Sequence, residues 1–115
     1  MITNIITALE TATGLSVKPF YTTSKSDCIV YNWYSLADDG AVANKKLELR
    51  LITSTYANAE SKRKKIIECL VPTGDNIKIN GLFECVLNGG GSLYDFDTKT
   101  VHTLLYFNCI TRSEN

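Results

Sequence analysis

The sequence predicts an α+β fold in which an antiparallel sheet of about four to five strands is flanked by two helices, in the order α-β-β-α-β-β-β. Two segments repeat apolar residues at helical spacing, and several others alternate apolar and polar residues with a period of two. The chain has 115 residues, of which 44% are hydrophobic, so it can bury a core of its own. No internal repeat or linker is visible, and we expect residues 1–115 to form a single domain.

The first helix is expected over residues 2–13. Its apolar residues follow the spacing i, i+3, i+4, i+7 and are Ile2, Ile5, Ile6 and Leu9. Gly14 is a natural end for this helix because glycine adopts the left-handed conformation easily. Residues 15–27 contain Pro19 and a polar run, which predicts an extended connection.

An antiparallel hairpin is expected next, from strands over residues 28–36 and 45–54. The first of these is rich in β-branched and aromatic residues. The second alternates Leu47, Leu49 and Leu51 with Lys46, Glu48 and Arg50, so one face packs and the other meets water or a partner. Between them, residues 37–44 carry the turn signal Asp38-Asp39-Gly40.

The second helix is expected over residues 58–71, with Asn58 as N-cap and Pro72 and Gly74 ending it. One stripe of this helix is shared by Ala59, Arg63, Ile66, Ile67 and Leu70. Residues 62–65 are four consecutive cations that fan around the helix. They are interpreted as a solvated helix face, with a docking patch for an acidic partner as the alternative.

Three further strands are expected over residues 77–79, 82–88 and 100–111. The last has apolar residues on both faces of its later half, which is typical of a central strand that is covered on both sides. The glycine run within residues 88–92 favours a flexible hairpin or a bulge. A phosphate-binding loop is the alternative, but such loops precede a helix, and here the following residues indicate a strand or turn.

Charge and cysteine content narrow the function classes. Residues 1–57 have five basic and five acidic side chains and residues 58–115 have seven of each, so neither half has a basic excess, which argues against a dedicated nucleic-acid-binding protein. No Cys-x-x-Cys pair occurs and His102 is the single histidine, so no metal site is expected. The cysteines are interpreted as buried small hydrophobic residues of a reducing cytoplasm: Cys28, Cys69, Cys85 and Cys109.

No catalytic constellation is evident, and neither an enzymatic activity nor a cofactor is expected. His102 alternates along a strand and has no partner that marks it as a base, so a hydrogen-bonded structural role is favoured. The acidic pairs Asp38-Asp39 and Asp95-Phe96-Asp97 are typical of caps and Asx-turns. The aromatic residues Tyr31, Trp33, Tyr34, Tyr106 and Phe107 favour a sheet core with some interface residues over a stacking platform for single-stranded nucleic acid.

The apolar segments are too short to span a bilayer, and residues 1–13 lack the basic start of a signal peptide. We therefore expect an intracellular protein without membrane contact.

Residues 1–71 resemble the tail-completion proteins of long-tailed bacteriophages and prophages, which include tail terminators and head–tail joining proteins. The resemblance is carried by the segment 27–32 (Asp-Cys-Ile-Val-Tyr-Asn), the alternating strand 47–53, and the helix start 56–60. Members of this family have a Pro-Tyr-(Ile/Val)-Val-Tyr strand at the place of segment 27–32. Ile29-Val30-Tyr31 matches its end, while Asp27 and Cys28 replace the proline and aromatic residue.

This resemblance implies a non-catalytic structural protein that forms a ring, a homo-hexamer in this family. The ring would cap the finished tail tube and offer a surface to the head connector. The implied location is the host bacterial cytoplasm during assembly and the tail or neck of the virion afterwards. The implied partners are further copies, the tail-tube protein and the connector, with no sequence-specific nucleic acid.

Two interface regions are expected. Lys46, Glu48 and Arg50 are predicted to face a neighbouring subunit or the ring lumen, since a ring subunit joins two different surface patches. The loop with Asp38, Asp39 and Gly40 is predicted to contact the tube. The alternative function is a small cytoplasmic protein- or peptide-binding module that uses an exposed sheet edge.

Overall fold

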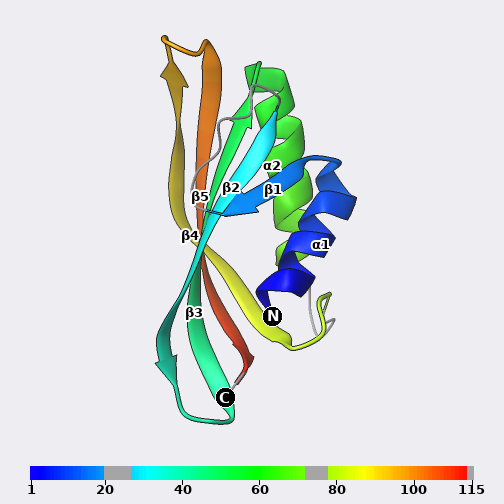
Figure 1. Cartoon of the computed structure of the whole chain (residues 1–115), viewed down its shortest axis with the longest axis vertical. Helices are drawn as coiled ribbons and strands as arrows, with labels where there is room; N and C mark the ends of the chain where they lie inside the picture. The colour runs from blue at the N-terminus through cyan, green and yellow to red at the C-terminus, as the bar shows by residue number, and fades with distance from the viewer. Residues whose placement is uncertain (20–26, 72–77, 114–115) are drawn as a thin grey trace.

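The computed structural model describes residues 1–19, 27–71 and 78–113, which form two helices and one five-stranded sheet (Figure 1). The helices are α1 (Ile2–Thr13) and α2 (Tyr56–Leu70). The strands are β1 (Ser16–Pro19), β2 (Cys28–Asp38), β3 (Val42–Thr53), β4 (Leu82–Asp95) and β5 (Thr100–Arg112). The predicted α+β class, the two helices and the number of strands are confirmed.

The sheet has the strand order β1-β2-β3-β5-β4. β1 runs parallel to β2, and the other neighbours are antiparallel, so the sheet is mixed and not purely antiparallel as predicted. β1 lies inside the segment expected to be a plain connection, which makes the observed order α-β-β-β-α-β-β. Pro19 is compatible with this strand because it stands at the end of a sheet edge, where no N–H is needed.

The short strand expected over residues 77–79 is not formed by its described part. Residue 77 lies outside the described residues, and residues 78–79 belong to a bend that leads into β4. The amide of Leu82 donates to the carbonyl of Ile79 at 3.0 Å, and Gly81 has a φ of 86°. A turn therefore occupies the place of the predicted strand.

The β2–β3 hairpin forms as predicted, but its strands are longer and its turn is shorter. Pairing runs from Cys28 opposite Ile52 to Asp38 opposite Ala43. Only residues 39–41 remain between the two strands. This hairpin ends below α1 in Figure 1, beyond the layer of the helices.

The core lies between the two helices and one face of the sheet. Leu47, Leu49 and Leu51 of β3 are buried, as their alternation predicted. They pack with Ile5 and Leu9 of α1, Ile66 and Leu70 of α2, and Leu105 and Phe107 of β5. Both helices lie on this one side of the sheet in Figure 1, so the fold is a two-layer arrangement.

Capping contacts explain where α1 ends and where α2 begins. Gly14 has a φ of 72° and its amide donates to the carbonyl of Glu10 at 2.9 Å, which confirms the predicted end of α1. α2 begins earlier than expected, because Thr55 and not Asn58 is its N-cap. The Thr55 side chain accepts a hydrogen bond from the amide of Asn58 at 3.2 Å.

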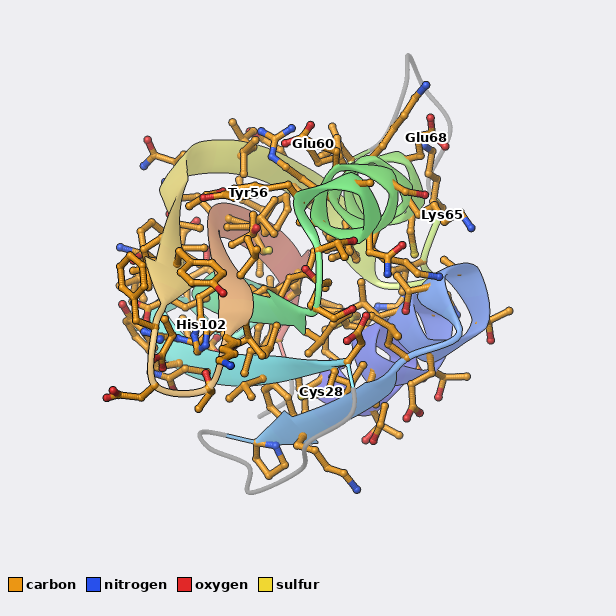
Figure 2. All side chains as sticks on the ribbon, turned by 90° about the horizontal axis from the view of Figure 1, so that it is seen from above. Cys28, Tyr56, Glu60, Lys65, Glu68 and His102 are labelled. Atoms are coloured by element: carbon orange, nitrogen blue, oxygen red, sulfur yellow. The ribbon has the colours of Figure 1, made fainter. Side chains whose placement is uncertain are left out.

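The four cations on α2 do not all face solvent. Lys62 Nζ donates to the carbonyl of Thr13 at 2.6 Å and so ties α2 to the end of α1. Arg63 is half-buried, whereas Lys64 and Lys65 are exposed. Lys65 points away from the sheet in Figure 2. The fan-like distribution expected for these residues is confirmed, with one member used for packing.

The glycine run is part of β4 and forms a bulge. Leu87 pairs with Phe107 and Gly90 with Leu105, so β4 has one more residue than β5 between these pairs. Gly89 and Gly90 have φ values of 102° and 148°. A Cβ at Gly90 would lie 2.2 Å from the carbonyl oxygen of Leu104. These positions therefore require glycine for the geometry of the strand.

Within the described ranges, neither helix combines the length and apolar character that crossing a membrane would require.

Candidate interaction surface

The face of the sheet opposite the helices carries a set of polar and aromatic side chains from four strands. On β5, residues 102, 104, 106 and 110 are half-buried, although sequence alternation predicted a strand covered on both faces. Both helices pack on the other face, so the apolar residues of this side are left partly exposed. We call this side, from β2, β3, β5 and β4, the open face.

The three charged residues predicted from β3 all lie on the open face. The hydroxyl of Tyr34 donates to Glu48 Oε1 at 2.8 Å. Lys46 Nζ lies 5.7 Å from the ring centroid of Tyr106, in a cation–π arrangement. Lys46 and Glu48 are half-buried and Arg50 is exposed. The structure thus brings these residues together with aromatic partners from β2 and β5.

Arg50 and His102 form a second polar group on the same face. His102 lies on the side of the sheet remote from α1 and α2 (Figure 2). Arg50 Nη1 is 3.1 Å from His102 Nδ1, and Thr100 Oγ1 is 3.0 Å from His102 Nε2. Arginine can only donate, so Nδ1 is the acceptor and Nε2 carries the proton of the neutral ring. Asp95 Oδ2 lies 3.9 Å from Nε2.

This arrangement favours neutral His102. Burial, and then the positive charge of Arg50, lower the pKa of His102, while Asp95 opposes the shift. The two hydrogen bonds and the neutral ring are compatible with the structural role that the sequence favoured. The described groups in contact with the ring are the guanidinium of Arg50, the hydroxyl of Thr100 and, at 3.9 Å, the carboxylate of Asp95.

A shallow hollow of about 210 Å³ lies in the middle of the open face. Val30 and Leu104 contribute apolar surface, and Asn32, Glu48 and Arg50 contribute polar groups. This combination can accept a side chain from another protein while its charges orient that side chain.

The predicted turn residues lie at a different place, the end of the β2–β3 hairpin. The amide of Gly40 donates to Asp38 Oδ1 at 2.8 Å, and Ser113 Oγ donates to the same oxygen at 2.8 Å. Given a strand rise of about 3.3 Å per residue, Lys46 lies roughly 10 Å and Arg50 roughly 23 Å along β3 from Ala43, the pairing partner of Asp38. The two predicted groups therefore form two separate surfaces.

The acidic pairs are turn-forming residues, as expected. Asp39 Oδ1 accepts from the amides of Ala41 and Val42 at 2.9 and 2.8 Å, and these bonds lower the pKa of Asp39. Asp95 Oδ1 accepts from the amide of Asp97 at 3.0 Å at the end of the β4–β5 hairpin. No group of three or more metal-ligating side chains that could hold an ion occurs in the described residues.

An exposed aromatic pair at the end of the β4–β5 hairpin was missed by the sequence reasoning. Phe96 is 82% exposed, and its ring contacts that of Tyr94 edge to face at 4.9 Å between centroids. The segment was interpreted only as strand or turn. An aromatic residue between two aspartates of a turn was the available signal, because a turn buries little surface.

The remaining aromatic residues divide between the two faces of the sheet. Tyr31, Trp33 and Phe107 belong to the core or pack against it. Tyr34 and Tyr106 lie on the open face. No common stacking platform results from these five residues.

Three of the four cysteines are buried, as predicted: Cys28, Cys85 and Cys109. Cys69 is only half-buried. Burial raises the pKa of Cys28 and of Cys69, so these two thiols are less acidic than usual.

Comparison with known proteins gives a match at the level of structure. No protein-family model matches the sequence, and no curated protein matches it. A chain in the virion of a native gene transfer agent (GTA) particle matches the structure with a TM-score of 0.68 and 14% sequence identity. The match covers 96% of this chain and 93% of that chain. The protein thus shares its fold, over nearly its whole length, with a chain of a virion.

Proposed function

We propose that this protein is a structural subunit of a phage or phage-like virion. The observation that carries the proposal is the whole-length match to a chain of the GTA virion, with 96% and 93% of the two chains covered. Such reciprocal coverage means that the likeness is not limited to a common substructure. The resemblance of residues 1–71 to tail-completion proteins supports the same class of protein.

The specific role that we propose is that of a tail terminator. Copies of this single-domain, non-catalytic subunit assemble into a ring, a hexamer by analogy with the resembled family. The ring caps the tail tube and presents a surface to the head connector. Assembly takes place in the host bacterial cytoplasm, and the ring then stays in the tail or neck of the virion.

We assign the open face to the contact between neighbouring subunits. Lys46, Glu48 and Arg50 project from one strand, and partners on β2 and β5 hold them in place. Side chains that are already ordered lose little entropy when a partner binds. In a ring, such a patch meets a different patch on the next subunit.

The test of assembly is the mass in solution, measured by light scattering over a range of concentrations, together with negative-stain images. We expect ring-shaped particles with a mass near six subunits, alone or after addition of tail-tube protein. A monomer that also fails to bind the tube protein would contradict the tail-terminator role.

A charge reversal tests the proposed interface. We expect Arg50→Glu to raise the protein concentration needed for ring formation at least tenfold, because a contact made by a positive side chain becomes repulsive. Lys64→Glu is the matched control, since Lys64 is exposed on α2 and not on the open face. Equal assembly of both variants would contradict the assignment of the open face to the subunit interface.

The hairpin end with Asp38, Asp39 and Gly40 is proposed as the contact to the tail tube. The double variant Asp38→Asn, Asp39→Asn retains side chains that form Asx-turns but removes both charges. If the carboxylates contact the tube, cosedimentation with tube protein falls while ring formation stays unchanged. Unchanged cosedimentation would exclude this contact.

A peptide- or protein-binding module remains the second candidate, because β4 offers an unused edge. Among the described residues, β4 pairs only with β5, and it exposes Phe83, Val86 and Leu93. An extended peptide could add to such an edge as a further strand. If the protein stays monomeric and binds extended peptides, and if Val86→Lys changes that binding, the binding-module function is favoured over the ring.

A further inference from the structure

Cys85 and Cys109 lie directly opposite each other on the edge strand β4 and its neighbour β5. Their Sγ atoms are 3.8 Å apart, and each residue is only 2% exposed. Directly opposed residues of antiparallel strands have Cα atoms about 4.5 to 5.5 Å apart. Disulfides occur at Cα separations of about 4.4 to 6.8 Å. The backbone here therefore already has the spacing that a disulfide needs.

We propose that Cys85 and Cys109 are a site of oxidative modification, at which a cross-strand disulfide forms with a low-molecular-weight disulfide as the electron acceptor. The bond would tie β4 covalently to β5. The proposal does not depend on the virion function, because it rests only on the position of the two thiols.

The other two cysteines are not equivalent to this pair. Cys28 pairs with Ile52, which pairs with His102, and therefore belongs to the open face. Cys85 and Cys109 are part of the core on the opposite face. Cys69 lies on α2 and is close enough to Cys85 to affect it electrostatically, so a Cys69–Cys85 bond is the competing product.

The closed core keeps Cys85 in the thiol form, whereas the hydrogen bond with Cys85 lowers the pKa of Cys109. The hydrogen bond with Cys109, and then burial, raise the pKa of Cys85, which leaves little of the reactive thiolate. β4 is an edge strand whose pairing with β5 is interrupted by the bulge between Leu87 and Gly90. Local opening at such an edge is the expected route by which an oxidant reaches the thiols.

The reaction consists of two exchange steps with oxidised glutathione as the acceptor. One cysteine thiolate attacks the glutathione disulfide, forms a mixed disulfide and releases one glutathione thiolate. The second cysteine then attacks the protein sulfur of the mixed disulfide, so that the Cys85–Cys109 bond forms and the second glutathione leaves. The two cysteine protons end on the two glutathione molecules, which carry the two electrons.

The experiment exposes the folded, reduced protein to oxidised glutathione and maps the products by mass spectrometry. Tryptic cleavage places Cys69 in peptide 66–78, Cys85 in peptide 79–99 and Cys109 in peptide 100–112. We expect peptides 79–99 and 100–112 to become linked in a bond that reductant breaks, and the count of titratable thiols to fall from four to two. The melting temperature should rise by about 10 °C, because the bond closes a long loop of the unfolded chain.

Two variants make the result specific. Cys69→Ser should still form the linked peptide, and Cys85→Ala should form none and gain no thermal stability on oxidation. The wild-type peptide map decides the question even if Cys85→Ala folds poorly. The proposal is overturned if peptide 66–78 is the linked partner, or if the linked protein melts no higher than the reduced one. It is also overturned if the folded protein keeps four thiols under conditions in which the urea-unfolded chain reacts.

Discussion

Gly90 and Gly91 are neighbours in β4, yet their surroundings differ completely. A Cβ at Gly90 would meet the carbonyl oxygen of Leu104 at 2.2 Å, and the φ of Gly90 is 148°. A Cβ at Gly91 would meet nothing within 4 Å, and no positive φ is found there. The first glycine is required by the bulge, and the second is not required by any contact of the described structure.

This contrast gives a matched pair of variants. We expect Gly90→Ala to lower the free energy of unfolding by at least about 2 kcal/mol, through backbone strain and the clash. Gly91→Ala should change it by less than about 0.5 kcal/mol or stabilise slightly. Urea denaturation measures both. Equal losses in the two variants would contradict the bulge geometry.

The protonation of His102 should depend on Arg50. The pKa of His102 is lower in the folded protein than in the unfolded chain, where it is about 6.5. At pH values above the unfolded-state pKa, the neutral ring therefore contributes its full stabilisation to the fold. This contribution is lost as the pH falls through the lowered folded pKa. In Arg50→Met, the imidazole resonance should titrate at higher pH, because the repulsive charge is gone.

The measurement is simple since His102 is the single histidine, and one NMR signal reports its titration. Lys46→Met is the control, because it removes a charge of the same strand that contacts Tyr106 and not the imidazole. A midpoint that moves equally in both variants would mean that the general charge of the face, and not the contact with Arg50, sets the pKa.

At the scale of residues, sequence alternation placed Lys46, Glu48 and Arg50 on one exposed face. It could not identify their partners Tyr34, Tyr106 and His102, since these come from other strands and depend on the register between them. Register is a property of the assembled sheet. The charged residues were therefore predictable, and the polar contacts they form were not.

At the scale of elements, the start of α2 depends on a single capping residue. Thr55 accepts a hydrogen bond from the amide of Asn58 at 3.2 Å. We expect Thr55→Ala to destabilise the protein by about 1 kcal/mol, whereas Thr55→Ser keeps the acceptor and most of the stability. Denaturant unfolding separates the two variants, and a loss of similar size in both would argue against the cap.

The elements with strong local signals were predicted well, and those held by distant contacts were not. α1 and β3 follow from the periodicity of their own residues, and Gly14 marks a boundary in both sequence and structure. β1 has four residues and ends in a proline, so its strand character comes only from parallel pairing with β2. Such pairing leaves no periodic trace in so short a segment.

At the scale of the whole molecule, the sheet differs in stability from centre to edge. β3 and β5 each pair on both sides, whereas β4 pairs on one side only within the described residues. We expect amides on the outer side of β4 to exchange with deuterium much faster than those of β3 and β5. Uniform protection of β4 in a monomer would contradict this, and protection that appears with concentration would report pairing between copies.

The division between a covered and an open face was the global property that sequence could not supply. Leu104, Tyr106 and Ile110 resemble core residues along β5, but the two helices are enough to cover only one face of the sheet. A second covering layer would require further helices or strands packed on the open face, and the local pattern of β5 does not indicate whether such elements are present.

The sheet has one edge, β4, that can pair with another strand and one edge, β1, that discourages pairing. For edge pairing the subunit is therefore comparable to a monofunctional monomer in polymer chemistry. β1 is four residues long and carries Lys18 and Pro19, two features that discourage further pairing, while β4 is 14 residues long. Two copies that joined through β4 would present only β1 at both outer ends. Growth by edge pairing would stop at a pair, which protects the protein from fibre formation. The ring proposed above would accordingly be joined through a face of the sheet and not through paired strand edges.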